Sequence, residues 1–245
     1  MPILPRSSKK TVPRLPEGLR IYAVPDIHGT DTALVDVLAR IDADRAVHPS
    51  ARAVQIFLGD YVDRGLASRQ VLDRLIERAS THEILMLKGN HETLFRDFPT
   101  NPSLLANWGK FGGLQTLISY GLKPSLNPGT EEQRELAREF ERAVPPAHFQ
   151  LIDQMPSSFS CGDFFFVHAG VRPGIPLGEQ KDEDLLWIRQ DFLLYEGDFE
   201  KFVIHGHTPV KEPEIRSNRI NLDTGAYATG RLTCLAIEGD RLEFI

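Results

Sequence analysis

Cysteine, long apolar runs and excess positive charge are all scarce in this sequence. Its 245 residues include two cysteines, Cys161 and Cys234. Two thiols are too few for a disulfide framework, so we expect a reducing compartment, the cytoplasm. No stretch approaches the ~18 apolar residues of a membrane span, and the N-terminus lacks the apolar core of a signal peptide. The net charge of −6 does not indicate nucleic acid or an anionic membrane as a partner.

Motifs of several phosphate-handling enzyme classes are also missing. A cysteine phosphatase needs Cys-x5-Arg, but Val167 stands six residues after Cys161, and Asp240 six after Cys234. The G-x-x-x-x-G-K-[ST] loop that holds nucleotide phosphates is absent. Asp42-Ala43-Asp44 follows a predicted helix, whereas an aspartyl-phosphate enzyme carries Asp-x-Asp after a strand. An acidic protein that acts on an anion must then draw positive charge from metals or a few arginines.

Hydrophobic periodicity predicts an α/β fold. Three apolar strands and three helices should alternate over the first part of the chain: Arg20–Pro25, Asp31–Ile41, Ala53–Leu58, Ser68–Ala79, Glu83–Lys88 and His91–Phe98. Later strands are short: Ser158–Cys161, Asp163–His168, Phe202–His205, Ile220–Asp223, Leu232–Glu238 and Arg241–Ile245. Because turns join the later strands, we expect an antiparallel second sheet.

The predicted organisation is one domain preceded by an arm. Residues 1–19 carry basic residues and prolines but little apolar pattern, so we expect a disordered arm there. Residues 20–245 should form a single domain. The stretch from 99 to 155 has glycine and proline breaks and a helical patch at Glu131–Ala143, and we expect a helical insertion that borders the substrate site.

Five predicted strands end in short motifs rich in Asp, Asn and His. In chain order these are Asp26-Ile27-His28-Gly29, Gly59-Asp60-Tyr61-Val62-Asp63-Arg64-Gly65, Gly89-Asn90-His91-Glu92, His168-Ala169-Gly170 and His205-Gly206-His207-Thr208. In α/β sheets, functional sites gather at the carboxyl ends of strands. Oxygen and nitrogen side chains of these types are ligands of divalent metals. The five motifs together therefore predict a metal site.

A single motif of this kind would have a simpler explanation. Asp-x-His-Gly is usually a turn, Asn90 could cap the N-terminus of a helix, and a histidine at a strand end such as His168 is usually structural. Five such coincidences, each after a strand, are hard to explain without a shared site.

The ordered set DIHG, GDYVDRG, GNHE, HAG and GHT resembles the PPP family of metallophosphatases, which includes serine/threonine protein phosphatases. It is most similar to the small bacterial and phage members, and Trp108–Gly121 and Leu222–Ala226 add to that likeness. The resemblance covers Ile21 to the C-terminus. It implies a calcineurin-like metallophosphoesterase sandwich of two mixed β-sheets flanked by helices. It also implies two divalent metal ions, for which we expect manganese, with iron or zinc as alternatives.

The resemblance also implies roles for individual residues. Six would be metal ligands: Asp26, His28, Asp60, Asn90, His168 and His207. Asp60 would bridge the two ions. His91 would be the general acid, oriented by Asp63, and Arg64 and Arg189 would bind phosphate oxygens. For Arg189 the alternative is a surface arginine on a helix.

Three positions near these motifs bear on the assignment. Pro25 stands where the family usually has glycine, which removes no ligand. His205 lies two residues before His207 and is an alternative ligand or a supporting group. Pro209 occupies the position where related two-metal phosphodiesterases carry another histidine, and this favours the phosphatase branch.

The resemblance favours a phosphoprotein (Ser/Thr) phosphatase, in which a metal-bridging hydroxide attacks a phosphate monoester directly. The expected partner is a phosphoprotein or phosphopeptide. The alternative is a nucleotide hydrolase of the symmetrical diadenosine tetraphosphatase type, and a non-catalytic scaffold is a third possibility. Because the stretch from Val171 to Gly206 is short, we expect an open site that cannot enclose two nucleosides. Diadenosine tetraphosphate should then be a poor substrate.

Overall fold

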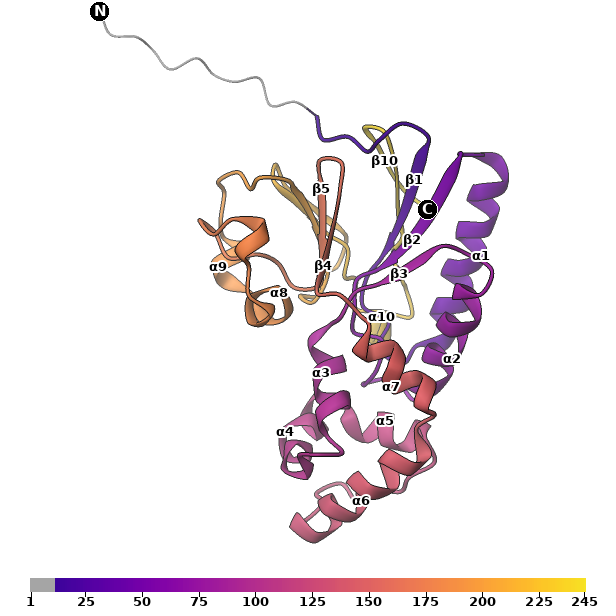
Figure 1. Cartoon of the computed structure of the whole chain (residues 1–245), viewed down its shortest axis with the longest axis vertical. Coiled ribbons are helices and arrows are strands. Elements are labelled where there is room, and N and C mark those ends of the chain that lie inside the picture. The colour runs from indigo at the N-terminus through magenta and orange to yellow at the C-terminus, as the bar shows by residue number, and fades with distance from the viewer. Residues whose placement is uncertain (1–11) are drawn as a thin grey trace, which may run out of the picture.

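Two five-stranded mixed sheets pack face to face in the computed structural model, which describes residues 12–245 (Figure 1). The first sheet has, in spatial order, β10 (Arg241–Phe244), β9 (Leu235–Glu238), β1 (Leu19–Val24), β2 (Arg52–Phe57) and β3 (Ile84–Met86). The second has β4 (Ser158–Cys161), β5 (Phe164–Val167), β6 (Phe202–His205), β8 (Arg219–Asn221) and β7 (Glu214–Ile215). The predicted fold class, an α/β sandwich of two mixed sheets, is confirmed.

Successive side chains of a strand point to opposite faces of a sheet, so each strand contributes alternately to two apolar cores. On β1, Tyr22 and Val24 join the apolar cluster beneath the helices, whereas Ile21 and Ala23 join the cluster between the sheets. Residues from both sheets fill that second cluster, including Ile56 and Phe166. Burial on both faces explains why the central strands are apolar throughout.

Helices cover the outer face of each sheet. The first sheet is covered by α1 (Asp31–Val47) and α2 (Ser68–Ala79), and the second by α8 (Asp182–Trp187) and α9 (Gln190–Leu193) (Figure 1). The segment after β3 is helical, with α3 (Asn90–Asp97), η1 (Pro102–Leu104), α4 (Leu105–Trp108), η2 (Gly109–Phe111), α5 (Gly113–Ser119), α6 (Thr130–Ala143) and α7 (Pro146–Asp153). Two short helices remain, η3 (Leu177–Glu179) and α10 (Ala226–Thr229).

The second sheet corrects one expectation. Its central strands β5, β6 and β8 run parallel, and only β4 and β7 pair antiparallel. The segment with α8 and α9 crosses over between β5 and β6, so β6 returns in the same direction as β5. The two-residue strand β7 was not predicted, because it is too short to show alternation.

The end of the predicted arm also differs from expectation. The backbone N–H of Leu15 donates to the carbonyl of Gly239 (2.9 Å), and the N–H of Arg14 donates to Asp163 Oδ2 (2.9 Å). Leu15 is buried in the cluster between the sheets. Residues 14–19 are therefore not a disordered arm, because Leu15 and Leu19 both pack in the cluster between the sheets. The first eleven residues lie outside the described part, and there the arm stays a prediction, as does the single domain over residues 20–245.

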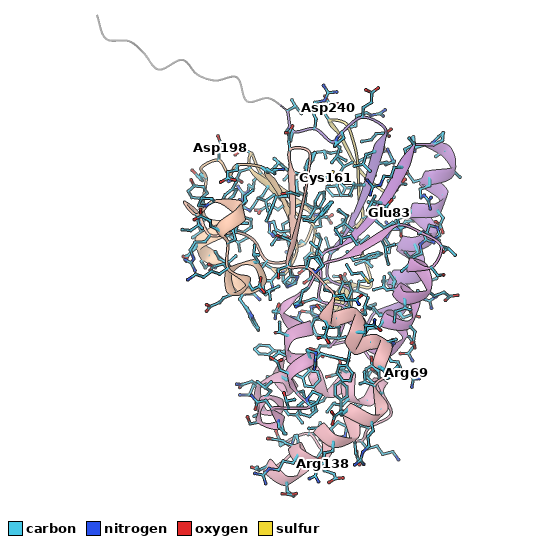
Figure 2. All side chains as sticks on the ribbon, in the orientation of Figure 1. Arg69, Glu83, Arg138, Cys161, Asp198 and Asp240 are labelled. Atoms are coloured by element: carbon cyan, nitrogen blue, oxygen red, sulfur yellow. The ribbon has the colours of Figure 1, made fainter. Side chains whose placement is uncertain are left out.

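Two further findings concern the absences noted in the sequence. Cys161, at the end of β4 (Figure 2), and the buried Cys234 are both free thiols. Among residues 12–245, no helix is both long and apolar enough to cross a membrane.

Candidate active site

The predicted ligands lie together at the carboxyl ends of strands from both sheets. Asp26 and His28 follow β1, Asp60 follows β2 and Asn90 opens α3 after β3, while His168 and His207 follow β5 and β6. All six side chains are buried, with at most 4% of each residue exposed. The site therefore joins the two sheets at one edge.

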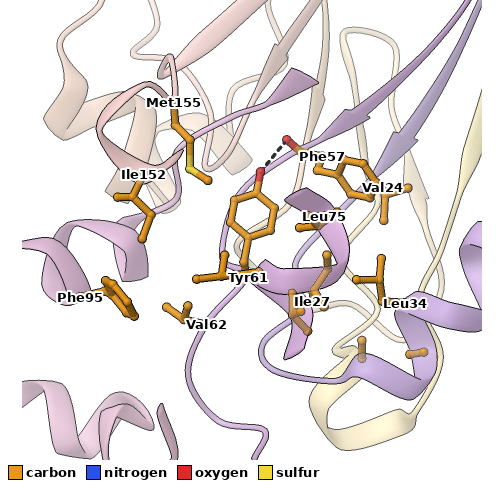
Figure 3. Packing of buried hydrophobic residues seen from close by; sticks show 14 of the residues in the cluster. Val24, Ile27, Leu34, Phe57, Tyr61, Val62, Leu75, Phe95, Ile152 and Met155 are labelled. Atoms are coloured by element: carbon orange, nitrogen blue, oxygen red, sulfur yellow. Dashed lines mark hydrogen bonds between the residues drawn. The ribbon is translucent and has the colours of Figure 1, made fainter. Parts of the chain in front are cut away.

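Tyr61 anchors the loop that carries three of the predicted site residues, Asp60, Asp63 and Arg64. Its ring lies in the apolar cluster near Phe57 and Phe95 (Figure 3). Its hydroxyl lies 3.1 Å from the carbonyl of Phe57 and 2.8 Å from that of Leu87, and it donates to this pair. Because Tyr61 is fixed, Asp60 before it and Asp63 after it are held at the edge of the site.

The backbone at the site is strained. Five non-glycine residues of the described chain have a positive φ: His28 (48°), Asp60 (54°), Asp63 (74°), Arg64 (66°) and His207 (68°). All five are predicted site residues. Side chains other than glycine rarely adopt this left-handed conformation, and such residues cluster where function requires a particular side-chain direction.

Two glycines make room for the carboxylates. A Cβ on Gly89 would lie 2.1 Å from Asp60 Oδ1, and a Cβ on Gly206 would lie 2.2 Å from Asp26 Oδ1. Both distances are far below a van der Waals contact, so no larger residue fits at either position while the carboxylates stay in place.

Two groups of potential metal ligands share Asp60. In the first group, His28 Nε2 lies 3.5 Å and His91 Nε2 3.7 Å from Asp60 Oδ2. Asp26 Oδ2 lies 3.9 Å from His28 Nε2. In the second group, His168 Nε2 lies 3.4 Å from Asp60 Oδ1.

The rest of the second group surrounds His168. Its Nε2 lies 2.9 Å from Asn90 Oδ1 and 3.0 Å from His207 Nδ1. The structure thus brings all six predicted ligands together in two groups, and it also places His91 within reach of the first.

Hydrogen bonds on the far side of two rings indicate what the two groups can bind. His168 Nδ1 donates to the carbonyl of Leu58 (3.0 Å), and His28 Nδ1 donates to that of Val62 (2.9 Å). Burial lowers the pKa of both rings, that of His28 to about 3, so both are neutral. Their Nε2 lone pairs therefore face carboxylate and amide oxygens with no proton between them, an arrangement that suits a shared cation.

The acidic residues support the same interpretation. Burial, followed by the charges of Asp223 and Asp60, raises the pKa of Asp26 well above its usual range. Burial also raises the pKa of Asp223 to about 6, although the backbone N–H of Gly225 and the two nearby arginines oppose this. Carboxylates buried together repel one another unless cations offset their charge. The donors present thus fit a pair of divalent cations.

His91 is oriented as the sequence predicted for a general acid. Its Nδ1 lies 2.6 Å from Asp63 Oδ2. Asp63 is fully buried and also accepts from Trp108 Nε1 (2.7 Å) and Thr116 Oγ1 (2.6 Å). Burial would lower the pKa of His91, but Asp60 and the hydrogen bond to Asp63 outweigh burial and raise this pKa to about 9. Trp108 and Thr116 were not predicted, since nothing local marks them as partners of Asp63.

Glu92 is a third residue whose role the sequence analysis missed. Its carboxylate accepts from the backbone N–H groups of Asp60, Tyr61 and Gly89, each at 2.8 Å. It lies three residues after Gly89, the position of the acidic residue in a capping box, so a signal was present. Asn90 does not cap α3, because Gly89 precedes the helix and Asn90 is its first residue.

The two predicted phosphate-binding arginines border the site on different elements. The Arg64 guanidinium lies over the ring of Tyr227, 4.4 Å from its centroid, and that ring lies 5.5 Å from the ring of His28. Arg189 Nη1 donates to Thr208 Oγ1 (3.2 Å), next to His207. Arg189 stands between α8 and α9 rather than within a helix, which differs from the surface-helix alternative.

His205 lies apart from both ligand groups. Its buried ring packs edge-on against Phe192, with centroids 4.9 Å apart, on the outer side of the second sheet. His207 therefore lies beside His168, whereas His205 does not.

Comparisons with known proteins add to this geometry. The family model for calcineurin-like phosphoesterases matches residues 19–234. PrpE of Anoxybacillus flavithermus, an asymmetrical bis(5'-nucleosyl)-tetraphosphatase, is 29% identical over 232 residues, which cover 86% of this chain and 87% of PrpE. The protein of the same name in Geobacillus thermodenitrificans is 30% identical over 245 residues, with 89% and 90% covered. The crystal structure of a candidate diadenosine tetraphosphatase has a TM-score of 0.64 at 19% identity, with 92% of each chain covered.

These relatives overturn one expectation from the sequence. The phosphoprotein (Ser/Thr) phosphatase interpretation and its phosphoprotein partner are wrong, because the curated relatives that match nearly the whole chain are named as nucleotide hydrolases. The ligands in the strand-end motifs cluster as a metal site would require, so these motifs point to the metal chemistry but do not by themselves decide the substrate.

Proposed function

Because the chain belongs to the calcineurin-like phosphoesterase family, we propose that it is a metal-dependent hydrolase of dinucleoside polyphosphates. The observation that carries this proposal is the pair of ligand groups sharing Asp60 in a chain whose full-length relatives are tetraphosphatases. We propose asymmetrical cleavage, in which water adds across one P–O–P bridge of a tetraphosphate. The products are a nucleoside triphosphate and a nucleoside monophosphate.

The six clustered side chains would hold two divalent ions, with Asp60 between them: Asp26, His28, Asp60, Asn90, His168 and His207. The mixed oxygen and nitrogen set suits manganese, iron or zinc better than calcium, and we propose manganese. When bound, such ions supply positive charge for the phosphate and lower the pKa of water at the site.

Other residues of the chain act on the substrate itself. Arg64 and Arg189 flank the ligand groups from different elements, and their guanidinium groups suit phosphate oxygens. His91 Nε2 faces the site, while its Nδ1 is held by Asp63, so it can give a proton to the departing oxygen. Asp63 keeps that ring in one orientation through bonds to Trp108 and Thr116.

A comparison of substrates tests this proposal. The manganese-loaded protein should hydrolyse diadenosine tetraphosphate with a higher kcat/KM than it hydrolyses any phosphopeptide or p-nitrophenyl phosphate. Chromatography of the products should give ATP and AMP, and chelated protein should be inactive. Two ADP would indicate symmetrical cleavage instead. A preference for phosphopeptides, or full activity without bound metal, would contradict the proposal.

A further inference from the structure

Three exposed aromatic rings surround the candidate active site, and two of them have no part in the chemistry proposed above. Phe111 is 44% exposed, Trp187 40% and Tyr227 42%. Residues 12–245 contain one further exposed aromatic side chain, Phe244 (43%), which lies on β10 at the outer edge of the first sheet. Exposed aromatic side chains thus concentrate around a polar centre, where folding alone gives no reason for them.

Each of the three rings stands edge-on to a different histidine of the site. The centroid of Phe111 lies 6.3 Å from that of His91, with ring planes at 74°. The centroid of Trp187 lies 6.5 Å from that of His207, at 82°.

The three rings come from distant parts of the chain. Phe111 is in η2 of the helical insertion, Trp187 ends α8 beside the second sheet, and Tyr227 is in α10 (the neighbouring α4, α8 and α10 are labelled in Figure 1). The three rings therefore reach the site from three separate elements.

Tyr227 differs from the other two rings because one of its faces already carries the Arg64 guanidinium. It therefore positions that arginine. Among the described residues, no arginine or lysine lies over Phe111 or Trp187. Both rings are exposed and lie close to the site. A flat ring of a ligand needs such a surface in order to stack.

We propose that Phe111 and Trp187 are stacking platforms for the two nucleobases of the substrate. This inference rests on the proposed function. Phe111 stands beside the acid His91 and receives the base on the leaving-group side. Trp187 stands beside the second ligand group and receives the other base. Selectivity for dinucleotides then needs no enclosing lid, which resolves the objection that an open site cannot hold two nucleosides.

Kinetic measurements on substrates with and without nucleobases test the proposed stacking platforms. Trp187→Ala and Phe111→Ala should each raise KM for diadenosine tetraphosphate by roughly 5- to 150-fold, the range for loss of one base–aromatic stack. Both variants should hydrolyse p-nitrophenyl phosphate, which carries no nucleobase, about as well as the wild type. Trp187→Phe should keep most of the affinity because it keeps a ring. Phe244→Ala removes an exposed aromatic side chain away from the site, and this matched control should leave the kinetic constants for both substrates unchanged. Equal losses on both substrates, or no loss on either, would overturn the proposal.

Fluorescence provides a test that does not depend on turnover. The chain has two tryptophans, of which Trp108 is buried and Trp187 is exposed. ADP should quench the tryptophan emission, inorganic pyrophosphate should not, and Trp187→Phe should abolish the ADP effect. Quenching by pyrophosphate as strong as by ADP, or ADP quenching that survives in Trp187→Phe, would contradict stacking on Trp187.

The two proposals can fail separately. If wild-type protein prefers dinucleotides but the alanine variants keep their KM, only the platforms are wrong. If wild-type protein does not prefer dinucleotides, yet ADP quenches Trp187 and pyrophosphate does not, the base site stands and the proposed substrate is wrong.

Discussion

His91 lies within reach of Asp60 and Asp63, and these contacts suggest two different roles. The hydrogen bond that His91 Nδ1 donates to Asp63 Oδ2 (2.6 Å) suits an acid, whereas Nε2 lies only 3.7 Å from Asp60 Oδ2, within the first ligand group. A single substitution separates the roles, because asparagine cannot supply the imidazolium proton.

We expect His91→Asn to lower kcat for an alkyl phosphate such as glycerol phosphate by roughly 10²–10⁴-fold, since an alkoxide needs a proton to leave. A phosphate leaving group has a pKa of about 6, so the loss of kcat on diadenosine tetraphosphate should be much smaller. The measurement is kcat on both substrates together with bound metal by elemental analysis. His82→Asn, a histidine outside the site, is the control. Loss of metal would make His91 a ligand, and equal losses on both substrates would exclude the acid role.

The sequence predicts the site residues that lie in contiguous motifs. It does not predict the residues that reach the site only because the fold brings distant segments of the chain together. Asp26, Asp60 and His168 follow strands in recognisable patterns, and the structure clusters them. Trp187 and Phe111 have no local pattern, because a functional role for an exposed aromatic residue can be inferred only from the residues that the fold places next to it. Substrate choice could not be predicted for the same reason.

The turn into α3 is the element on which the geometry of Asp60 depends. Gly89 leaves space for the carboxylate of Asp60, and Glu92 ties the backbone of both residues together. The sequence predicted a helix at this position. It could not predict that the side chain three residues into the helix would bind a loop about thirty residues earlier.

Gly89→Ala should disrupt the site without removing any ligand. Its Cβ would lie 2.1 Å from Asp60 Oδ1, so the carboxylate must move. We expect metal content to fall and kcat/KM to drop by about 100-fold, a typical effect of a displacement near 1 Å. Circular dichroism should still show the folded state. The matched control is Gly129→Ala before α6, where nothing lies within 4 Å of the added Cβ. Full metal content in Gly89→Ala would show that Asp60 is not needed in its present position.

At the scale of the whole molecule, the site connects the two sheets. Asp26 and Asp60 come from the first sheet, and His168 and His207 from the second. Bound ions would hold the sheets together at the end where loops replace strand contacts. Metal binding and resistance to unfolding should therefore be linked.

Removal of metal should lower the unfolding temperature. An ion present at 100 times its Kd stabilises the folded state by about 2.7 kcal/mol, which corresponds to about 5–10 °C for a chain of this size. We expect EDTA to cause a decrease of that order in a calorimetric scan. Manganese should restore the original value and calcium should restore less, because calcium prefers oxygen ligands alone. An unchanged unfolding temperature, with elemental analysis proving that metal was lost, would contradict this link.

The left-handed backbone at the site has a consequence for how such a protein evolves. His28, Asp60, Asp63, Arg64 and His207 each hold a conformation that costs about 1 kcal/mol or more for a residue with a Cβ, in a domain whose total stability is typically about 5–15 kcal/mol. Glycine at any of the five positions would relieve that cost and abolish the side chain. Selection for heat resistance alone would therefore change the catalytic residues early. A descendant that keeps this fold but loses its activity should carry glycine where this chain carries histidine, aspartate or arginine.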